Sequence, residues 1–277
     1  MIIITDSSAL YSPEEGKKLD LEVLPLQVAI NNKCYKEFVE IQSSEFIDLV
    51  RKGYIPTSSQ PPIGETIELF EKNQNEDTLV INMADGLSGT YQSTLSAKES
   101  VENNEHIHVL NSMTLCGPQR YLVQKALHLR ELGYDINSIL VELENSIKST
   151  RSFLIPQDFS FLKRGGRLTP LAATIGGLLK IIPVMKTTED GTRLEKFAVK
   201  KTMKGAIKEI IRSFHEMGVD ENYIIYVSHA DVLLQAQEVV HQIQKDFDNV
   251  KIELLDLSPA FITQGGPECI AVQTIRM

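Results

Sequence analysis

The sequence lacks the short motifs that mark the commonest cofactor and metal sites. It contains no G-x-G-x-x-G, no G-x-x-x-x-G-K-[ST] and no H-E-x-x-H, so nicotinamide-binding, P-loop and zinc-protease sites are without their basic parts. Cysteine is scarce, with three residues at wide spacing (Cys34, Cys116 and Cys269) and no C-x-x-C. An odd number of separated cysteines predicts buried free thiols instead of a disulfide framework or a zinc site. We therefore expect no metal and no cofactor.

Positive charge and long apolar runs are also in short supply. The 277 residues carry 28 Lys and Arg against 37 Asp and Glu, and the formal net charge of −9 opposes nonspecific attraction to nucleic acid or to an anionic membrane. No stretch approaches the roughly 18 apolar residues that a membrane-spanning helix needs, and the first residues, MIIITDSSAL, lack a basic leader. We expect a cytoplasmic protein without a membrane span, whose 42% hydrophobic residues suffice for a sizeable core.

Short β-branched apolar runs alternate with helix patterns. Between them, Ser12 and Glu15 form a capping box that starts a helix, and residues 43–53 end in basic residues and a glycine, which are signals of a helix C-terminus. This alternation predicts an α/β fold with a mostly parallel sheet flanked by helices, in which ligands lie beyond the carboxyl ends of the strands. The runs that predict buried strands are 2–5, 78–83, 106–110, 223–228 and 251–257.

The pattern changes near residue 150. Two extended runs flank Asp190 and Gly191, the turn pair of a β-hairpin, so an antiparallel element enters the second part of the chain. Long helix patterns follow at 201–218 and 231–247. We expect two domains, with a mostly parallel sheet in residues 1–153 and a mixed sheet in residues 154–277.

The stretch DGLSGTYQS, residues 85–93, packs two glycines, a serine and a threonine into a strand-to-helix junction. It comes within one residue of the G-x-S-x-G nucleophile elbow, in which Ser88 would attack and His229 would be the base, but no oxyanion segment is recognisable. Alternatively, Ser88 and the N–H groups of the next turn bind a carboxylate or a phosphate. A third interpretation is a tight turn that Ser88 only caps. The residues alone leave all three open.

Two further polar stretches lie near predicted element boundaries. In TDSS, residues 5–8, Asp6 or Ser7 either caps the next helix or belongs to a site. The loop YIPTSSQPPIG, residues 54–64, is concentrated in Pro, Ser and Thr and precedes a helix. We regard this loop as a second candidate site.

A basic cluster occurs in FLKRGGRLT, residues 161–169. Lys163, Arg164 and Arg167 surround two glycines, which predicts a mobile basic loop in an otherwise acidic protein. Such a loop suits a phosphate group or an acidic partner. A solvated charge run is equally compatible with the spacing.

Seven motifs together resemble, in order and spacing, the motif series of the DegV family. They are TDSS, TSSQPP, DGLSGTYQS, LKRGGRLT, the hairpin and helix DGT…KKTMKGAIKEI, HA at 229–230, and QGGPE, and they span the whole chain. The resemblance implies a two-domain α/β protein that holds one long-chain fatty acid in a tunnel between the domains, like the fatty-acid-binding subunit of bacterial fatty acid kinase. Such a subunit is not an enzyme. It presents the carboxylate to a separate ATP-dependent kinase subunit, which makes acyl phosphate.

The resemblance also implies roles for individual residues. Ser88, followed by Gly89 and Thr90 in the family's GLSGT motif, should donate a hydrogen bond to the fatty acid carboxylate. Ser58, with Thr57 as its near neighbour, should supply the second hydroxyl.

Three positions depart from the family's pattern. The family's arginine at the start of the helix after the hairpin aligns with Lys201, which keeps the charge but loses the bidentate fork. The histidine before the family's C-terminal TGPG motif aligns with Gln264, and the last glycine of that motif aligns with Glu268. A glutamate there would repel a doubly charged acyl phosphate unless its side chain points away.

A lipid tunnel needs apolar walls, which residues 153–162 and 172–185 could supply, although both stretches also fit an ordinary core. Burying some 15 methylenes at about 0.8 kcal/mol each gives on the order of 12 kcal/mol, so hydroxyl contacts need only orient the head group. The leading hypothesis is a non-enzymatic fatty acid carrier whose basic loop faces outward toward the kinase. The alternative is a serine hydrolase acting on a lipid ester, with Ser88 as nucleophile.

Overall fold

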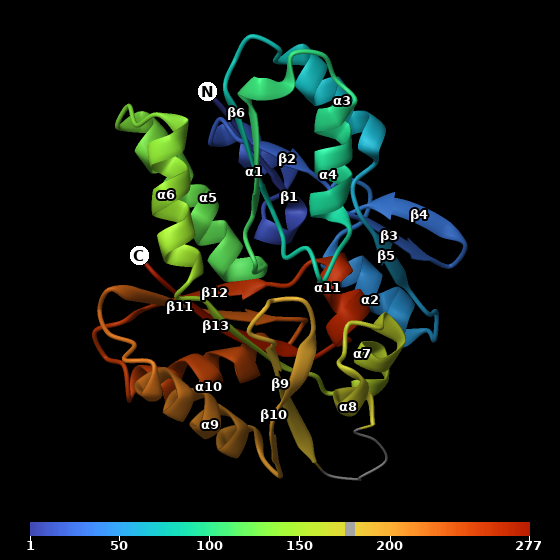
Figure 1. The fold of residues 1–277 in the computed structure, drawn as a ribbon. Helices are drawn as coiled ribbons and strands as arrows, with labels where there is room; N and C mark the ends of the chain where they lie inside the picture. Colours follow the sequence, from blue (N-terminus) through green and yellow to red (C-terminus); the bar gives the residue numbers. More distant parts are fainter. Residues whose placement is uncertain (175–180) are drawn as a thin grey trace.

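The N-terminal part of the chain builds a parallel sheet. The computed structural model describes residues 1–174 and 181–277, and within them this sheet has the order β2-β1-β6-β7 with all neighbours parallel (Figure 1). Every residue of β6 is buried, which is why its sequence reads as a continuous apolar run. The predicted parallel sheet and its strands at 2–5, 78–83 and 106–110 are confirmed, whereas the strand at 22–24 was not predicted. The strands are β1 (Ile2–Asp6), β2 (Glu22–Leu24), β6 (Thr78–Asn82) and β7 (Ile107–Asn111).

The C-terminal sheet is mixed. Its order is β10-β9-β8-β13-β11-β12, and of these neighbours β11 and β12 run parallel while the others are antiparallel. Asp190 and Gly191 lie between β9 and β10, so the predicted hairpin is confirmed. All residues of β8 pair with β13, and the expected domain boundary between 153 and 154 therefore falls inside a strand. The strands are β8 (Arg151–Ile155), β9 (Ile182–Thr187), β10 (Leu194–Lys200), β11 (Tyr223–His229), β12 (Lys251–Asp256) and β13 (Ile270–Arg276).

A small antiparallel sheet, β4-β3-β5, adjoins the two larger ones. It comprises β3 (Gln27–Ile30), β4 (Lys33–Lys36) and β5 (Thr57–Ser59). The prediction of a loop at 54–64 was wrong for β5, because three of its residues pair with β3. The prediction of buried thiols was wrong for Cys34, which is exposed on β4, an edge strand, whereas Cys116 and Cys269 are buried.

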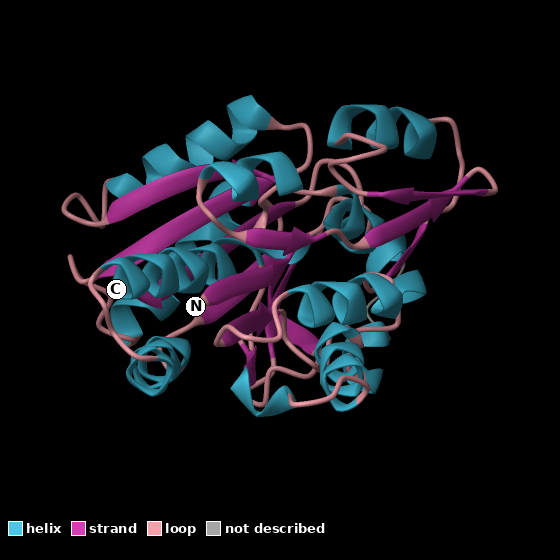
Figure 2. Ribbon diagram, turned by 90° about the horizontal axis from the view of Figure 1, so that it is seen from above, coloured by secondary structure: helices cyan, strands magenta, loops and turns pink. Residues whose placement is uncertain are grey.

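Helices cover the faces of both large sheets (Figure 2). The sequence signals that define their ends are present, since Ser12 and Glu15 form the expected capping box at the start of α1. The helices are α1 (Pro13–Lys18), α2 (Ser43–Arg51), α3 (Ile63–Lys72), α4 (Thr90–Glu99), α5 (Cys116–Glu131), α6 (Ile136–Ile147), α7 (Phe159–Gly165), α8 (Pro170–Ala173), α9 (Met203–Glu216), α10 (Leu233–Gln244) and α11 (Pro259–Gly265), with 3-10 turns η1 (Ser7–Ala9) and η2 (Asn104–His106).

Helix α5 joins the two large sheets into one core. It contacts β1 and β6 on one side and β11 and β13 on the other. The approach is close because residue 117 is a glycine, where an added Cβ would lie 2.1 Å from the ring of the buried Tyr226. Because α5 packs tightly against both sheets, the loops that follow the strands of one sheet are fixed relative to the loops of the other.

Candidate functional site

Two adjoining cavities lie between segments that follow β6 and segments of the C-terminal sheet. One is apolar and encloses about 100 Å³, with Leu154 and Leu162 among its lining residues. The other encloses about 240 Å³ and is lined by polar residues that include Ser58, Gln60 and Ser88. The two share a wall made of Met83, Leu87, Arg167, Phe261 and Gln264. An apolar space thus adjoins a polar one, which suits a molecule with an apolar body and a polar end.

Ser88 lies at the turn between β6 and α4. Its Oγ is 2.8 Å from Thr90 Oγ1 and accepts a hydrogen bond from the Thr90 N–H at 3.3 Å. Gly89 is the N-cap of α4, and an added Cβ there would lie 2.6 Å from Gln60 Oε1, so glycine leaves room for the side chain of Gln60. Ser88, Gly89 and Thr90 are therefore grouped as expected, with Ser88 and Gly89 lining the polar cavity.

Ser58 meets Gln264 across the polar cavity. Gln264 Nε2 donates a hydrogen bond to Ser58 Oγ at 3.1 Å, although the two residues are 206 positions apart. Gln264 Oε1 is buried and has no hydrogen-bond partner among the described residues. Thr57 is exposed and does not line the cavity. The structure brings Ser58, Ser88 and Gln264 together and leaves Thr57 outside.

The basic residues at 161–169 are divided between two environments. The expected mobile loop is helix α7 as far as residue 165, where Lys163 and Arg164 are exposed. The expectation that all three side chains face outward was wrong for Arg167. Its Nε donates to Leu87 O at 3.1 Å and its Nη1 donates to Gly165 O, so the guanidinium is held at the wall shared by the cavities.

The signal for this inward turn is the glycine that precedes Arg167. Gly166 ends α7 with a φ of +72°, a left-handed conformation that reverses the chain. From the sequence, the pair of glycines indicates a helix end, but nothing in it shows which basic side chain the reversal directs into the protein. Phe261 lines both cavities, and no motif in the sequence marks it as a site residue.

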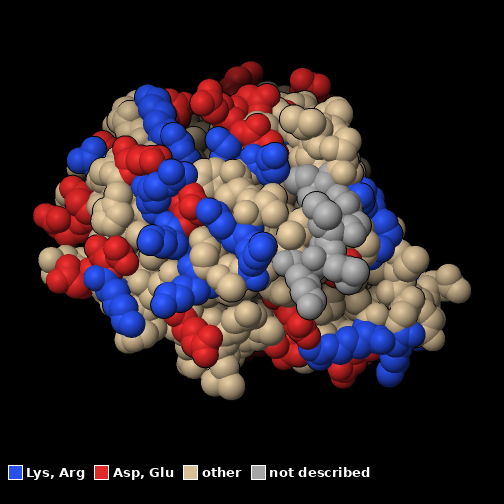
Figure 3. All heavy atoms as spheres, turned by 90° about the horizontal axis from the view of Figure 1, so that it is seen from below, with Lys and Arg blue, Asp and Glu red and all other residues tan. Residues whose placement is uncertain are grey.

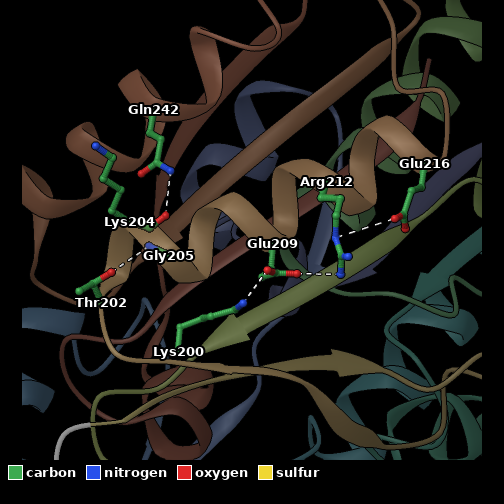
Figure 4. A network of polar contacts seen from close by, with 8 residues as sticks. All are labelled: Lys200, Thr202, Lys204, Gly205, Glu209, Arg212, Glu216 and Gln242. Atoms are coloured by element: carbon green, nitrogen blue, oxygen red, sulfur yellow. Dashed lines mark hydrogen bonds and ion pairs between the residues drawn. The ribbon is translucent and has the colours of Figure 1, made fainter.

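Lys201 lies far from the other expected ligands. It is exposed between β10 and α9, whereas the opposite end of β10, at Leu194, reaches the apolar cavity. Six residues of strand separate the two positions by about 20 Å. Figure 4 shows the surroundings, where the side chain of Thr202 caps α9 and Lys200 pairs with Glu209 at 2.6 Å. Lys and Arg side chains gather on this lower face of the molecule (Figure 3).

Glu268 points away from the polar cavity. Its carboxylate lies 3.7 Å from Arg51 Nη2 and borders a different surface pocket. The residue has a φ of +65°, in the left-handed region that favours glycine. The carboxylate of Glu268 is thus directed away from the residues that line the polar cavity.

His229 does not face Ser88. Its ring is 4% exposed, its Nε2 lies 3.5 Å from Asp256 Oδ1, and it lines a separate cavity of about 580 Å³ together with Arg120. The nucleophile elbow therefore lacks the base that the sequence suggested, and the hydrogen-bond partner of Ser88 is Thr90.

Asp6 and Ser7 are buried and serve the structure around the cavities. Asp6 caps η1, where its Oδ1 accepts from Ser8 N at 3.1 Å. Its Oδ2 accepts from Asn82 Nδ2 at 3.1 Å and from Met83 N at 3.0 Å. This supports the capping interpretation, and the carboxylate also fixes the chain where Met83 enters the cavity wall.

The expected lipid walls are realised in part. Phe153, Leu154 and Leu162 line the apolar cavity, as expected for residues 153–162. Of the stretch 172–185, residues 175–180 lie outside the described residues. Ala172 and Met185 pack into a hydrophobic cluster instead of the cavity wall. Across the described ranges, no helix is long and apolar enough to cross a membrane, and no group of three or more His, Cys, Asp or Glu could hold a metal ion.

Comparison with known proteins gives consistent matches along the whole chain. The model of a family described as "uncharacterised protein, DegV family" matches residues 1–277. A DegV domain-containing protein of Halalkalibacterium halodurans is 33% identical over 276 residues, which cover 98% of this chain and 96% of the relative.

Solved structures agree with these sequence matches. The crystal structure of DegV of Bacillus subtilis, described as a fatty acid binding protein, has a TM-score of 0.87 and 28% identity over 100% of this chain and 99% of that one. A fatty acid binding DegV family protein of Streptococcus agalactiae has a TM-score of 0.89 and 27% identity over 100% and 98% of the two chains.

Proposed function

This chain belongs to the DegV family, and we propose that it holds one long-chain fatty acid with the acyl chain in the apolar cavity and the carboxylate in the polar cavity. The observation that carries the proposal is the wall shared by the two cavities. Relatives described as fatty acid binding proteins have the same fold over the full chain, which supports this choice of ligand.

The acyl chain would gain most of its binding energy from the apolar cavity. The enclosed volume of about 100 Å³ is below the roughly 300 Å³ at which ligand pockets begin. A long chain must therefore widen the cavity by rotamer changes of unbranched or γ-branched side chains such as Met83, Leu87 and Leu154. Because burial of each methylene contributes about 0.8 kcal/mol, the total for a long chain exceeds the cost of a few such rotations.

The carboxylate would be bound by neutral donors and one cation. The hydroxyls of Ser58 and Ser88 and the amide of Gln264 can donate hydrogen bonds, and Arg167 supplies a positive charge at the wall shared with the apolar cavity. Hydrogen bonds to a charged group contribute roughly 1.5–3 kcal/mol each. These contacts orient the head group, while burial of the acyl chain supplies most of the affinity.

The carrier would act without catalysing a reaction itself and would present the carboxylate to an ATP-dependent fatty acid kinase in the cytoplasm. Lys163 and Arg164 are exposed on α7, one turn before the inward-facing Arg167, and suit an acidic partner surface. His229 is not available to Ser88, which favours the carrier over the lipid ester hydrolase.

The test is to extract protein purified from a bacterial host with organic solvent and to identify the acyl chains by mass spectrometry. We expect close to one fatty acid per chain. Native mass spectrometry of the same preparation should show the corresponding mass, which should vanish after delipidation. Folded protein that carries no fatty acid and does not take up added palmitate would refute the proposal.

A further inference from the structure

Glu37 is a fully buried carboxyl group at the junction between the small sheet and α11. Its side chain is 0% exposed. Its Oε1 accepts a hydrogen bond from the Ser7 hydroxyl at 2.5 Å, and its Oε2 accepts from the Ala260 N–H at 2.9 Å. The carboxylate therefore ties η1, near the N-terminus, to a helix near the C-terminus.

The backbone holds Glu37 rigidly in this place. The Glu37 N–H donates to Leu26 O at 3.0 Å, and the Leu26 N–H donates to Ser7 Oγ at 2.8 Å, so the three residues form a closed ring. Among the ion pairs of the described residues, none involves Glu37. The charged or titratable groups that face it are Asp6, at the end of β1, and the thiol of Cys116, on α5.

Helix α11 carries side chains of the proposed fatty acid site. Ala260 is its second residue and lines the polar cavity, and Phe261 and Gln264 lie on the wall shared by both cavities. The hydrogen bond from Ala260 to Glu37 fixes the N-terminal end of this seven-residue helix. A shift of α11 would move Phe261 against the acyl chain and Gln264 against the head group.

The strength of this tie depends on the proton of Glu37. An ionised carboxylate accepts from both Ser7 and Ala260, and such charge-assisted bonds are about twice as strong as neutral ones. A protonated carboxyl group must donate from one oxygen, so it keeps the Ala260 bond only as a neutral one. Burial, with a smaller effect of the negative charge on Asp6, raises the pKa of Glu37 to about 7, so both forms are populated near neutral pH.

We propose that Glu37 is a positioning residue for the fatty acid site, whose ionised carboxylate holds α11 in the binding geometry and whose protonation weakens fatty acid binding. This inference rests on the proposed function. Protonation of Glu37 would make lipid uptake and release sensitive to pH, although this side chain does not touch the lipid.

The test measures the affinity of delipidated protein for palmitate about 1.5 pH units below and above 7. Wild-type affinity should fall on the order of fivefold at the lower pH, the loss expected when a charge-assisted bond becomes a neutral one. Glu37→Gln keeps the shape of the side chain, with Oε1 accepting from Ala260 and Nε2 donating to Ser7 Oγ. It should bind at the weaker level at both pH values.

Glu45→Gln is the matched control, because Glu45 is an exposed carboxylate on α2. It should follow the wild-type pH profile. Hydrogen exchange of residues 260–265, corrected for the intrinsic pH dependence, should be faster in wild type at low pH and equally fast in Glu37→Gln at both pH values.

Binding by Glu37→Gln at full strength, or with the wild-type pH profile, would overturn the inference while leaving the proposed function intact. Absence of palmitate binding by wild type at every pH would instead refute the proposed function, and the inference with it.

Discussion

Gly86→Ala tests whether contact between the two parts of the chain shapes the fatty acid site. Gly86 lies two residues before Ser88, and an added Cβ would stand 2.1 Å from Thr192 Cα and 2.6 Å from Thr192 O. Ordinary contact begins at 3.4 Å, so the backbones must separate by about 1.3 Å. The hairpin tip resists such movement, because Asp190 Oδ1 accepts hydrogen bonds from the N–H and hydroxyl of Thr192.

Forcing extra volume into a packed contact lowers stability by roughly 1–3 kcal/mol. We expect a loss of this size in the free energy of unfolding, measured by denaturant titration, together with weaker palmitate binding because the Ser88 turn is displaced. The matched control is Gly64→Ala, where an added Cβ meets nothing within 4 Å. Gly64 lies in α3, so this control should be neutral or up to about 1 kcal/mol more stable. Wild-type stability and affinity in Gly86→Ala would refute the reasoning.

Three further predictions concern the head group, the kinase and buried charge. Ser88→Ala combined with Ser58→Ala should reduce palmitate affinity by roughly 1.5–3 kcal/mol per lost bond, measured by calorimetric titration of folded protein. Lys163→Ala combined with Arg164→Ala should leave palmitate affinity unchanged but slow acyl phosphate formation by a supplied fatty acid kinase, with a smaller difference at high salt. Because burial raises the pKa of Glu37 from 4.5 to about 7, the ionised carboxylate costs the whole fold stability although its bonds to Ser7 and Ala260 are the stronger ones; the fold is therefore most stable below pH 4.5, and this stability is lost as pH rises through about 7. Glu37→Gln should abolish that loss of about 3 kcal/mol in denaturant unfolding at a series of pH values.

Each of these predictions has a control or a contrary outcome. Ser96→Ala changes an exposed serine on the same helix as Thr90 and should not affect affinity. Ser88 should resist labelling by a fluorophosphonate, and efficient labelling would favour the hydrolase. Lys17→Ala with Lys18→Ala removes two exposed charges from α1, and an equal loss of kinase turnover in that pair would assign the effect to net charge. For the buried carboxyl group, a pH profile of unfolding shared by wild type and Glu37→Gln would contradict the raised pKa.

Local patterns in the sequence predicted the elements that depend on neighbouring residues. The capping box at Ser12 needs only the next three residues, and the hairpin around Asp190 and Gly191 needs only turn conformation and flanking extended runs. The parallel sheet followed from the alternation of buried apolar runs with helix patterns. In each case the signal is a pattern among neighbouring residues, so the sequence displays it directly.

Three features of the site were beyond such patterns. The hydrogen bond between Ser58 and Gln264 joins residues 206 positions apart. Arg167 faces inward because its guanidinium donates hydrogen bonds to the carbonyl oxygens of Leu87 and Gly165. Lys163 carries the same charge four residues earlier, and its side chain is exposed. Lys201 follows the last residue of β10, and the length of this strand separates it from the cavity that Leu194 reaches at the first residue.

The sequence by itself determined the α/β class, the strand-to-helix turn that presents Ser88, and the family, because these depend on local periodicity, turn chemistry and motif order. Only the tertiary structure decided which polar groups meet. Whether a charged or hydroxyl side chain faces solvent or a cavity depends on the donors and acceptors that packing brings from distant segments, and on the water that packing excludes. Glu37 shows this most clearly, since its surroundings in sequence are ordinary and its carboxylate is nonetheless fully buried against Ser7 and Ala260.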